Sequence, residues 1–333
     1  MKILVAMPRG DVRASFIPPG VAAEIGELGE VDWNEGVEQL SPRELGERLR
    51  GVDVCFTGWG CACFTREVLS GAENLRVIAH TGGSVGTLVD EAAYARGIHV
   101  ISGNEIYAKS VAEGVIAYAL ASLRGIPRFA AHMLREGWQP QEWQSEGLFG
   151  QTVGLVGFGA VARHLVPLLH AFEMDIKVYA DHVTPEEEAR YGITKTTLED
   201  VCSTCKIISL HTSATPEYHH MIDEGMLSLI PDGALLINTA RGMVMDEDAL
   251  ARYAATGRFR VMLDVYEKEP LPMDSPLRHM DNVLMIPHMA GPTTDRRPYV
   301  TRALIGDVRA VMSGKLPALA ISLEQARRMT RDT

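Results

Sequence analysis

Short apolar runs recur along the whole chain and alternate with segments whose apolar residues have helical spacing. Strands that alternate with helices are typical of α/β proteins with parallel sheets. The runs are almost continuously apolar, which indicates strands that are covered on both faces. We expect parallel strands over the following runs: KILVAM, VDVCFTG, LRVIAHT, TVGLVGFG, DIKVYAD, KIISLHT, ALLINTA, RVMLDVY and NVLMIPH.

The helical segments begin with favourable signals. Residues 41–50 start with Ser-Pro-Arg-Glu, which combines a serine cap, a proline in the first turn and a glutamate that closes a capping box. The acids at 246–248 suit the positive end of another helix. A further helix is expected over 299–315, after the last strand, and we predict that it returns to pack on the first domain.

One long segment is harder to divide. Residues 110–135 have helical spacing throughout, and Pro127 is expected to break or kink the helix. Residues 136–151 are polar and rich in turn formers, so we expect a loop there before the next strand begins.

Length and charge restrict the class of protein. A chain of 333 residues is too long for one compact core, which predicts two domains. The net charge of −11 argues against nucleic acid or an anionic membrane as partner. We see no signal peptide and no apolar run of the roughly 18 residues that span a membrane. We expect a cytoplasmic protein that places cations locally if its substrate is anionic.

The five cysteines are Cys55, Cys61, Cys63, Cys202 and Cys205. An odd number in a long chain does not suggest a disulfide framework. Cys202 and Cys205 have the C-x-x-C spacing of redox and zinc sites, but no second pair of ligands follows at the spacing of a zinc finger. We therefore predict structural thiols and no metal.

The strongest local pattern is TVGLVGFGAVARHLVPLL, in which a strand runs into a glycine turn and then a helix. The turn, Gly157-Phe158-Gly159-Ala160-Val161-Ala162, matches the G-x-G-x-x-A fingerprint of dinucleotide binding. Gly157 allows the tight turn, and Gly159 lets the backbone approach a pyrophosphate at the helix N-terminus. A glycine turn in a protein that binds no dinucleotide is the alternative.

The next expected strand supports the fingerprint. It ends at Asp181, a little over 20 residues downstream. An acid at this position accepts hydrogen bonds from a ribose diol and repels a 2′-phosphate. Since no arginine follows in DHVTPEEE, the sequence favours NAD over NADP as the cofactor.

Three polar residues follow late strands: Arg241 after ALLINTA, Glu269 beyond RVMLDVY and His288 after NVLMIP. Residues just past the carboxyl ends of parallel strands face the ligand crevice, so we expect the three side chains near the nicotinamide. A histidine can exchange a proton with a carbonyl oxygen. A carboxylate can orient that histidine, and an arginine can hold a substrate carboxylate with two hydrogen bonds.

Each of these residues also has a simpler interpretation. Arg241 could be a solvated cation after a strand, Glu269 a surface acid, and His288 a structural histidine beside Pro287. Glu267 competes with Glu269 for the role of the orienting acid, and the residues alone do not separate the two.

Taken in order, these motifs resemble those of the D-isomer-specific 2-hydroxyacid dehydrogenases, a group that includes phosphoglycerate and glycerate dehydrogenases. The resemblance extends from about Val111 to Gly291 and rests on TVGLVGFGAVA, VYAD, LINTARGMVMDEDAL, LDVYEKEPLP, DSPL and NVLMIPHMAG. It implies that Arg241, Glu269 rather than Glu267, and His288 are the catalytic residues. The cofactor contacts that it implies beyond the fingerprint and Asp181 are His211, Thr212, Thr239, Ala240, Arg241, Asp264, His288 and Gly291.

The resemblance also implies an architecture. We expect two Rossmann- or flavodoxin-like parallel-sheet domains with the active-site cleft between them. Residues 1–103 with 291–333 would form the substrate-binding domain, and residues 104–290 the NAD-binding domain. Family members are commonly homodimers, so a homodimer is expected here.

The first domain matches the family less well. After the strand RVIAH, a glycine-rich loop offers the amides of Gly83, Ser84 and Val85 to a substrate carboxylate. The loop departs from the usual pattern, so no family substrate can be carried over. Tyr107 and Lys109 could shape substrate choice, and simple packing is an equal alternative for Tyr107.

The expected function is NAD-dependent hydride transfer between the nicotinamide and a D-2-hydroxy acid or 2-keto acid, a small carboxylate substrate. A phosphite-type dehydrogenase of the same fold is an alternative, because such enzymes keep the acid. Formate enzymes usually have Gln at the position of Glu269, which argues against formate. An NAD-sensing corepressor-like binding protein is an alternative from a different class. The particular 2-keto acid and the direction of the reaction stay open.

Overall fold

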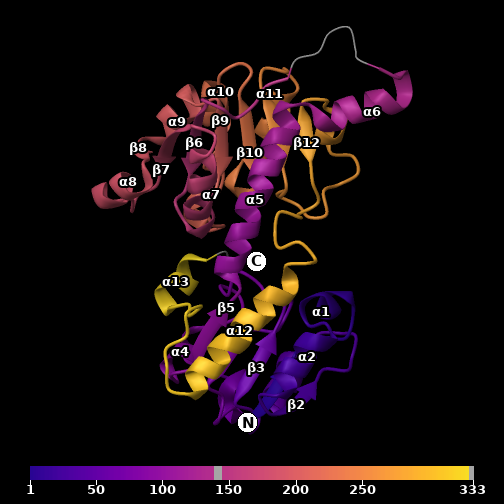
Figure 1. Ribbon diagram of the computed structural model, residues 1–333, viewed down its shortest axis with the longest axis vertical. Coiled ribbons are helices and arrows are strands. Elements are labelled where there is room, and N and C mark those ends of the chain that lie inside the picture. The colour runs from indigo at the N-terminus through magenta and orange to yellow at the C-terminus, as the bar shows by residue number, and fades with distance from the viewer. Residues whose placement is uncertain (139–144, 330–333) are drawn as a thin grey trace. The chain divides into compact units, whose positions relative to one another are not determined.

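The computed structural model describes residues 1–138 and 145–329. The chain forms two compact units (Figure 1): unit 1 contains Met1–Tyr107 and Pro292–Thr333, and unit 2 contains Ala108–Gly291. The predicted domain boundaries at 103/104 and 290/291 fall close to these divisions.

Unit 1 is built on a five-stranded parallel sheet with the order β2-β1-β3-β4-β5. Because the chain turns to one side of β1 to form β2 and to the other side to form β3, the switch in strand order lies between β1 and β3. The strands are β1 (Lys2–Val5), β2 (Glu30–Trp33), β3 (Val54–Thr57), β4 (Val77–His80) and β5 (His99–Ser102).

Helices cover both faces of the unit 1 sheet, which explains why its central strands are almost wholly apolar. The predicted C-terminal helix is present and contacts α1, α2, β4 and β5, so its return to the first domain is confirmed. Its bounds and those of the other helices are α1 (Asp11–Phe16), α2 (Pro19–Gly26), α3 (Pro42–Arg48), η1 (Val68–Gly71), α4 (Glu91–Ala95), α12 (Arg297–Met312) and α13 (Leu323–Arg328).

Unit 2 contains a seven-stranded parallel sheet with the order β12-β11-β10-β9-β6-β7-β8. Here the strand order switches between β6 and β9. The strands are β6 (Thr152–Val156), β7 (Asp175–Tyr179), β8 (Thr194–Lys195), β9 (Ile207–Leu210), β10 (Leu235–Asn238), β11 (Arg260–Leu263) and β12 (Val283–Met285). Two parallel-sheet α/β domains were predicted, and this prediction is confirmed.

Two hydrophobic clusters lie on the opposite faces of the unit 2 sheet. Leu235 and Ile237 belong to one cluster and Leu236 to the other, since alternate residues of a strand face opposite ways. The helices around the sheet are α5 (Asn104–Leu123), α6 (Ile126–Glu136), α7 (Ala160–His170), α8 (Pro185–Tyr191), α9 (Leu198–Thr204), η2 (Pro216–Tyr218), α10 (Glu224–Leu229), η3 (Gly242–Val244), α11 (Glu247–Ala254) and η4 (Pro276–His279).

The helix predicted over 110–135 breaks earlier than expected. It divides into α5 and α6 at Gly125, which has a left-handed φ of +62° that glycine adopts without strain. Pro127 does not cause the break but lies in the first turn of α6, where its missing N–H costs no hydrogen bond. Part of the loop predicted over 136–151, residues 139–144, lies outside the described residues.

Helix α5 corrects a second expectation. By length and composition it is apolar enough to cross a membrane, although no such run was predicted. It carries the charged residues Glu105, Lys109 and Glu113. Its buried Ala112 and Ala119 pack in the core of unit 2, while 28% of its most apolar window is buried.

The cysteines of the C-x-x-C motif are packing residues. Cys202 and Cys205 are free and fully buried. Burial raises the pKa of the Cys202 thiol to about 12 and that of Cys205 to about 11, so both are protonated and unreactive near neutral pH. Within the described ranges, no group of three His, Cys, Asp or Glu side chains is placed to hold a metal ion.

Candidate active site

The fingerprint turn depends on a glycine at its first position. Gly157 follows β6 with a φ of +100°, and a Cβ there would lie 2.8 Å from the carbonyl oxygen of His211. Its amide donates a hydrogen bond to the carbonyl of Tyr179 at the end of β7, with an N···O distance of 2.8 Å. The turn is therefore fixed against the strands on both sides of it, at the switch point of the sheet.

Gly159 leaves open space at the start of α7. No heavy atom lies within 4 Å of the position that its Cβ would occupy. No side chain caps this helix, so its first N–H groups have no capping acceptor. This is the arrangement in which a helix N-terminus binds a phosphate group. Phe158 itself is buried and packs edge-on against Tyr191, so only its backbone can contact a cofactor.

Asp181 is exposed two residues beyond the end of β7, where the fingerprint places an acid. The structure also brings a cation to this position, which the sequence analysis missed. Lys195 donates hydrogen bonds from Nζ to the backbone carbonyls of Asp181 and Val183, at 3.0 and 3.2 Å. Its ammonium group is thus held near the acid by backbone contacts.

Buried polar atoms line the carboxyl edge beside the fingerprint. His211 and Thr212 follow β9, and Thr239 follows β10. In the described part of the chain, His211 Nε2, Thr212 Oγ1 and Thr239 Oγ1 have no hydrogen-bond partner. Burial lowers the pKa of His211 to about 4, so its ring is neutral near neutral pH. Buried polar atoms require partners, and the polar groups of a dinucleotide fit this donor and acceptor set.

The turn that carries Arg241 is shaped by the buried Asn238 at the end of β10. The Asn238 side chain donates to the carbonyl of Arg241 at 2.9 Å and accepts from the amide of Ala240 at 3.0 Å. The guanidinium of Arg241 donates to the carbonyl of Ala240 at 2.7 Å. These contacts hold the arginine at the carboxyl edge of the sheet.

Gly242 joins this turn to the loop after β11. A Cβ at Gly242 would lie 1.9 Å from the carbonyl carbon of Tyr266, so only glycine fits between the two backbones. The loop after β11 carries Glu269, whose Oε1 accepts from the amide of Tyr266 at 3.1 Å. Arg241 and Glu269 therefore stand on loops that pack directly on each other.

His288 follows β12 and pairs with Glu269. Its Nδ1 lies 2.7 Å from Oε2 of Glu269, and both side chains are partly exposed, at 49% and 38%. The backbone of His288 has a φ of +52°, which is uncommon for a residue other than glycine. A hydrogen bond of 2.8 Å from its amide to the carbonyl of Asp264 supports this conformation.

Asp264 organises the same loop. Its side chain is buried and accepts hydrogen bonds from the amides of Met289 and Ala290, at 2.7 and 3.0 Å. Burial raises the pKa of this carboxyl, and the two amide hydrogen bonds oppose that effect. A contact of Asp264 with the nicotinamide stays a prediction, beside this role in holding the His288 loop.

The structure separates the two competing acids. Glu267 does not contact His288 but pairs with His220, whose Nε2 lies 2.5 Å from Oε1 of Glu267. The amide of His220 donates to the carbonyl of Met243 at 2.8 Å. This second histidine–glutamate pair was missed in the sequence, and it connects the loop of Glu269 with the turn that follows Arg241.

In unit 1, the predicted substrate loop follows β4. The amide of Val85 donates to the sulfur of Met329 at 3.5 Å, and the carbonyl of Gly83 accepts from Ser102 Oγ at 3.0 Å. Only the Val85 contact engages an amide N–H, and binding of a carboxylate by this loop stays a prediction. Tyr107 is largely buried, and burial raises the pKa of its hydroxyl, whereas Lys109 is exposed.

The matching family model is that of the D-isomer specific 2-hydroxyacid dehydrogenase, NAD binding domain, over residues 116–290. This match covers more than half of the chain. The chain belongs to the D-isomer specific 2-hydroxyacid dehydrogenase family. The predicted resemblance is confirmed, and the family match supports the predicted nicotinamide dinucleotide cofactor and the class of NAD-dependent oxidoreductases.

Curated relatives and solved structures agree with this family. The chain is 32% identical to the glyoxylate reductase of Thermofilum pendens over 78% of each chain. It is 31% identical to the D-3-phosphoglycerate dehydrogenase of Methanocaldococcus jannaschii over 89% of its own length, but it spans only 56% of that relative. The crystal structure of the TT0316 protein from Thermus thermophilus has a TM-score of 0.79 at 28% identity, over 97% of this chain and all of the other.

Proposed function

We propose that this protein is an NAD-dependent dehydrogenase that interconverts a D-2-hydroxy acid and a 2-keto acid. The observation that carries the proposal is the convergence of Arg241 and the Glu269–His288 pair at the carboxyl edge of the unit 2 sheet. The uncapped start of α7 and the open space at Gly159 belong to the same edge, so the groups for binding and for chemistry stand together.

His288 is the proposed acid and base. With Nδ1 paired to Glu269, Nε2 is the ring nitrogen left to exchange a proton with the substrate oxygen. When bound, the nicotinamide supplies or accepts the hydride. In the reducing direction, His288 Nε2 donates a proton to the carbonyl oxygen as negative charge develops on it. In the oxidising direction, the same nitrogen accepts the hydroxyl proton, and Glu269 stabilises the charged ring.

Arg241 is the proposed anchor for the substrate carboxylate. Its planar guanidinium can donate two parallel hydrogen bonds to a carboxylate, which orients the neighbouring carbonyl carbon. The turn that carries it is fixed by Asn238 and Gly242, so little freedom is lost when substrate binds. Glu269 and His288 stand on the loops next to this turn. A 2-keto acid whose carboxylate is held by Arg241 can therefore present its carbonyl oxygen to His288, as hydride transfer to that carbonyl requires.

NAD is the proposed cofactor, because the exposed carboxylate of Asp181 suits a ribose diol and repels a 2′-phosphate. The ammonium of Lys195 is already engaged by two carbonyls. All five cysteines are free, as expected in a reducing compartment, and we place the protein in the cytoplasm.

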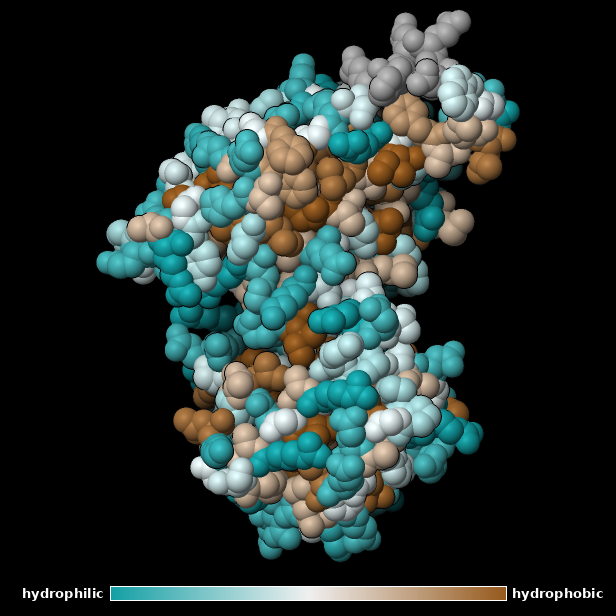
Figure 2. Space-filling model, in the orientation of Figure 1, coloured by the Kyte–Doolittle hydropathy of each residue, from teal (hydrophilic) through white to brown (hydrophobic). Residues whose placement is uncertain are grey.

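We further propose a homodimer. No residue of helix α6 is fully buried within its own unit. The helix exposes Ile126, Met133 and Leu134, and Trp138 beyond it is also exposed. Figure 2 shows brown side chains beside the grey residues, where Figure 1 places α6. An exposed apolar helix face is a common contact between protein copies.

Oxidation of NADH should be measured against a panel of 2-keto acids, and the configuration of the product should be determined by chiral chromatography. We expect turnover of at least one 2-keto acid and a product of D configuration. Tight NADH binding without turnover across the panel would instead support the NAD-sensing alternative.

A further inference from the structure

The turn after β7, residues 181–184, carries the acid that we assign to the ribose diol of the cofactor. The side chain of Asp181 is exposed, so its position depends on the backbone that carries it. The ammonium of Lys195, on the neighbouring edge strand β8, donates to the carbonyls of Asp181 and Val183 at 3.0 and 3.2 Å. One cation thus bridges the first and third residues of the turn.

Lys195 is itself held in place. Its backbone amide donates to Oε1 of Glu188 on α8 at 2.7 Å. Its strand pairs in parallel with β7, and Lys195 lies opposite Val178 in the register. The ammonium is therefore brought to the turn from a strand whose position is fixed against β7.

The far end of the turn is tied to the fingerprint helix. Thr184 caps α8 in a capping box with Glu187, whose Oε2 accepts from the amide of Thr184 at 3.3 Å. The other oxygen of Glu187 accepts from Arg163 of α7 at 2.8 Å. One glutamate thus joins the turn that carries Asp181 to the helix whose N-terminus is proposed to bind the pyrophosphate.

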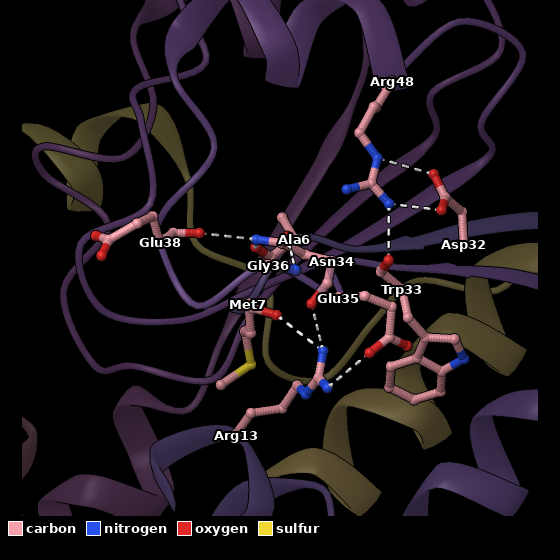
Figure 3. Close-up of polar contacts among 10 residues, drawn as sticks. All are labelled: Ala6, Met7, Arg13, Asp32, Trp33, Asn34, Glu35, Gly36, Glu38 and Arg48. Atoms are coloured by element: carbon pink, nitrogen blue, oxygen red, sulfur yellow. Dashed lines mark hydrogen bonds and ion pairs between the residues drawn. The ribbon is translucent and has the colours of Figure 1, made fainter. Parts of the chain in front are cut away.

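Unit 1 has the same kind of contact where its own strands end. Figure 3 shows that Arg13 donates from Nη1 to the carbonyls of Met7 and Asn34, at 3.3 and 2.7 Å. Met7 lies two residues beyond β1, as Asp181 lies two residues beyond β7, and Asn34 follows β2 directly. A cation that donates to two backbone carbonyls can therefore fix the path of the chain where it leaves a parallel strand.

We propose that Lys195 is a positioning residue that determines cofactor choice, because it holds the turn so that the carboxylate of Asp181 stays at the ribose. This rests on the proposed function, in which Asp181 contacts the ribose diol of NADH. A carboxylate accepts hydrogen bonds from a diol but repels the 2′-phosphate of NADPH. Since the repulsion between two charges falls with their distance, the discrimination weakens when the acid can swing away.

The first test measures cofactor choice during turnover. The ratio of kcat/KM for NADH to that for NADPH should be determined with the best 2-keto acid in the wild type, in Lys195→Met and in Lys206→Met. Lys206 is the matched control, because its ammonium is also paired, with Glu146 at 2.8 Å, but it directly precedes β9 at the opposite edge of the sheet.

We expect the ratio to fall about 10-fold in Lys195→Met, the equivalent of about one hydrogen bond to a charged group. The fall should come mainly from a higher KM for NADH, with the KM for the keto acid unchanged. Lys206→Met should keep the wild-type ratio. Lys195→Arg should recover most of it, because a guanidinium can also donate to two carbonyls.

Two outcomes would overturn the proposal. An unchanged ratio in Lys195→Met would show that the contact does not affect cofactor choice. A higher ratio, caused by weaker use of NADPH, would show that Lys195 binds the 2′-phosphate instead. The double variant Lys195→Met, Asp181→Ala should have the ratio of Asp181→Ala alone, because the lysine acts through the acid.

The second test does not depend on turnover. NADH and NADPH should be titrated into the whole chain while the fluorescence of the reduced nicotinamide is recorded. We expect the preference for NADH, as a ratio of the two Kd values, to fall about 10-fold in Lys195→Met and to persist in Lys206→Met. If no 2-keto acid is reduced but this pattern is present, the proposed function fails and the positioning role stands. If 2-keto acids are reduced but Lys195→Met keeps the wild-type preference, the positioning role fails.

Discussion

Nδ1 of His288 lies 2.7 Å from Oε2 of Glu269, although the two residues come from the ends of different strands. The other oxygen of Glu269 accepts from the amide of Tyr266, and the amide of His288 donates to the carbonyl of Asp264. Each residue is therefore held by a hydrogen bond to a backbone group in addition to the hydrogen bond between the two side chains. The pair forms one unit whose second ring nitrogen is available for proton exchange.

Replacement of Glu269 by Gln should remove the charge that supports a protonated His288. Because acid–base catalysis contributes about 10²- to 10⁴-fold, we expect kcat to fall by about 10²-fold in Glu269→Gln and further in His288→Asn. NADH affinity, measured by fluorescence, should change little in either variant. The double variant should be no slower than His288→Asn alone, since the two residues act together. Additive losses would show that they act separately.

Replacement of Arg241 tests the carboxylate anchor. We expect kcat/KM to fall at least about 10²-fold in Arg241→Ala, because a bidentate charged contact is lost. Arg241→Lys should recover little, since an ammonium cannot reproduce the planar pair of donors. Steady-state kinetics with the best 2-keto acid would measure both effects. Recovery to near wild-type kinetics in Arg241→Lys would contradict bidentate binding.

The His220–Glu267 pair should act at a distance from the substrate. It joins the loop of Glu269 to the turn after Arg241, so we describe His220 as a positioning residue. In His220→Ala, kcat should fall roughly 10-fold while the KM for NADH stays near the wild-type value, because a misplaced catalytic group lowers the rate steeply.

A matched variant separates this role from a simple loss of folding. His220 has a φ of +50°, and Asn tolerates this conformation better than Ala and keeps a side-chain donor. His220→Asn should therefore recover most of kcat. If His220→Asn and His220→Ala lose kcat equally, the contact with Glu267 has no positioning role.

Much of the architecture followed from the sequence, because central strands that are buried on both faces leave continuous apolar runs. Three strands carried no such signal. β2 and β5 lie at the two edges of the unit 1 sheet, the residues of β2 are exposed or only partly buried, and β8 has two exposed residues. Edge and very short strands bury too little surface to leave a pattern in the sequence.

The site was only partly predictable for a similar reason. Arg241 and His288 follow strands directly, so their place at the carboxyl edge could be inferred. The choice between Glu267 and Glu269 depends on the path of a loop and came only from the family resemblance. His220 gave no signal, because its partner Glu267 is distant in sequence.

His80, which is buried, and His211, whose Nε2 atom is buried, should make stability depend on pH. Burial lowers the pKa of His80 in unit 1 and of His211 in unit 2 to about 4. In the unfolded chain each has a pKa of about 6.5. Between these values the unfolded state binds a proton that the folded state does not, so stability rises with pH across this window. The contribution of the two neutral histidines to the free energy of unfolding is fully present above about pH 6.5 and falls as the pH approaches 4.

His80 allows a direct test of this prediction. Its Nδ1 lies 2.9 Å from Thr57 Oγ1 in the core of unit 1. The difference between the two pKa values predicts that protonation of His80 in the unfolded chain lowers the free energy of unfolding by about 2 kcal/mol as the pH falls from about 7.5 to about 5. In His80→Gln, the difference in free energy of unfolding between these two pH values, measured by urea unfolding, should be smaller than in the wild type by about that amount. This holds whatever the stability of the variant at about pH 7.5. The exposed His279 provides the control, because His279→Gln should keep the wild-type pH dependence. An unchanged pH dependence in His80→Gln would show that His80 does not titrate upon unfolding as its burial requires.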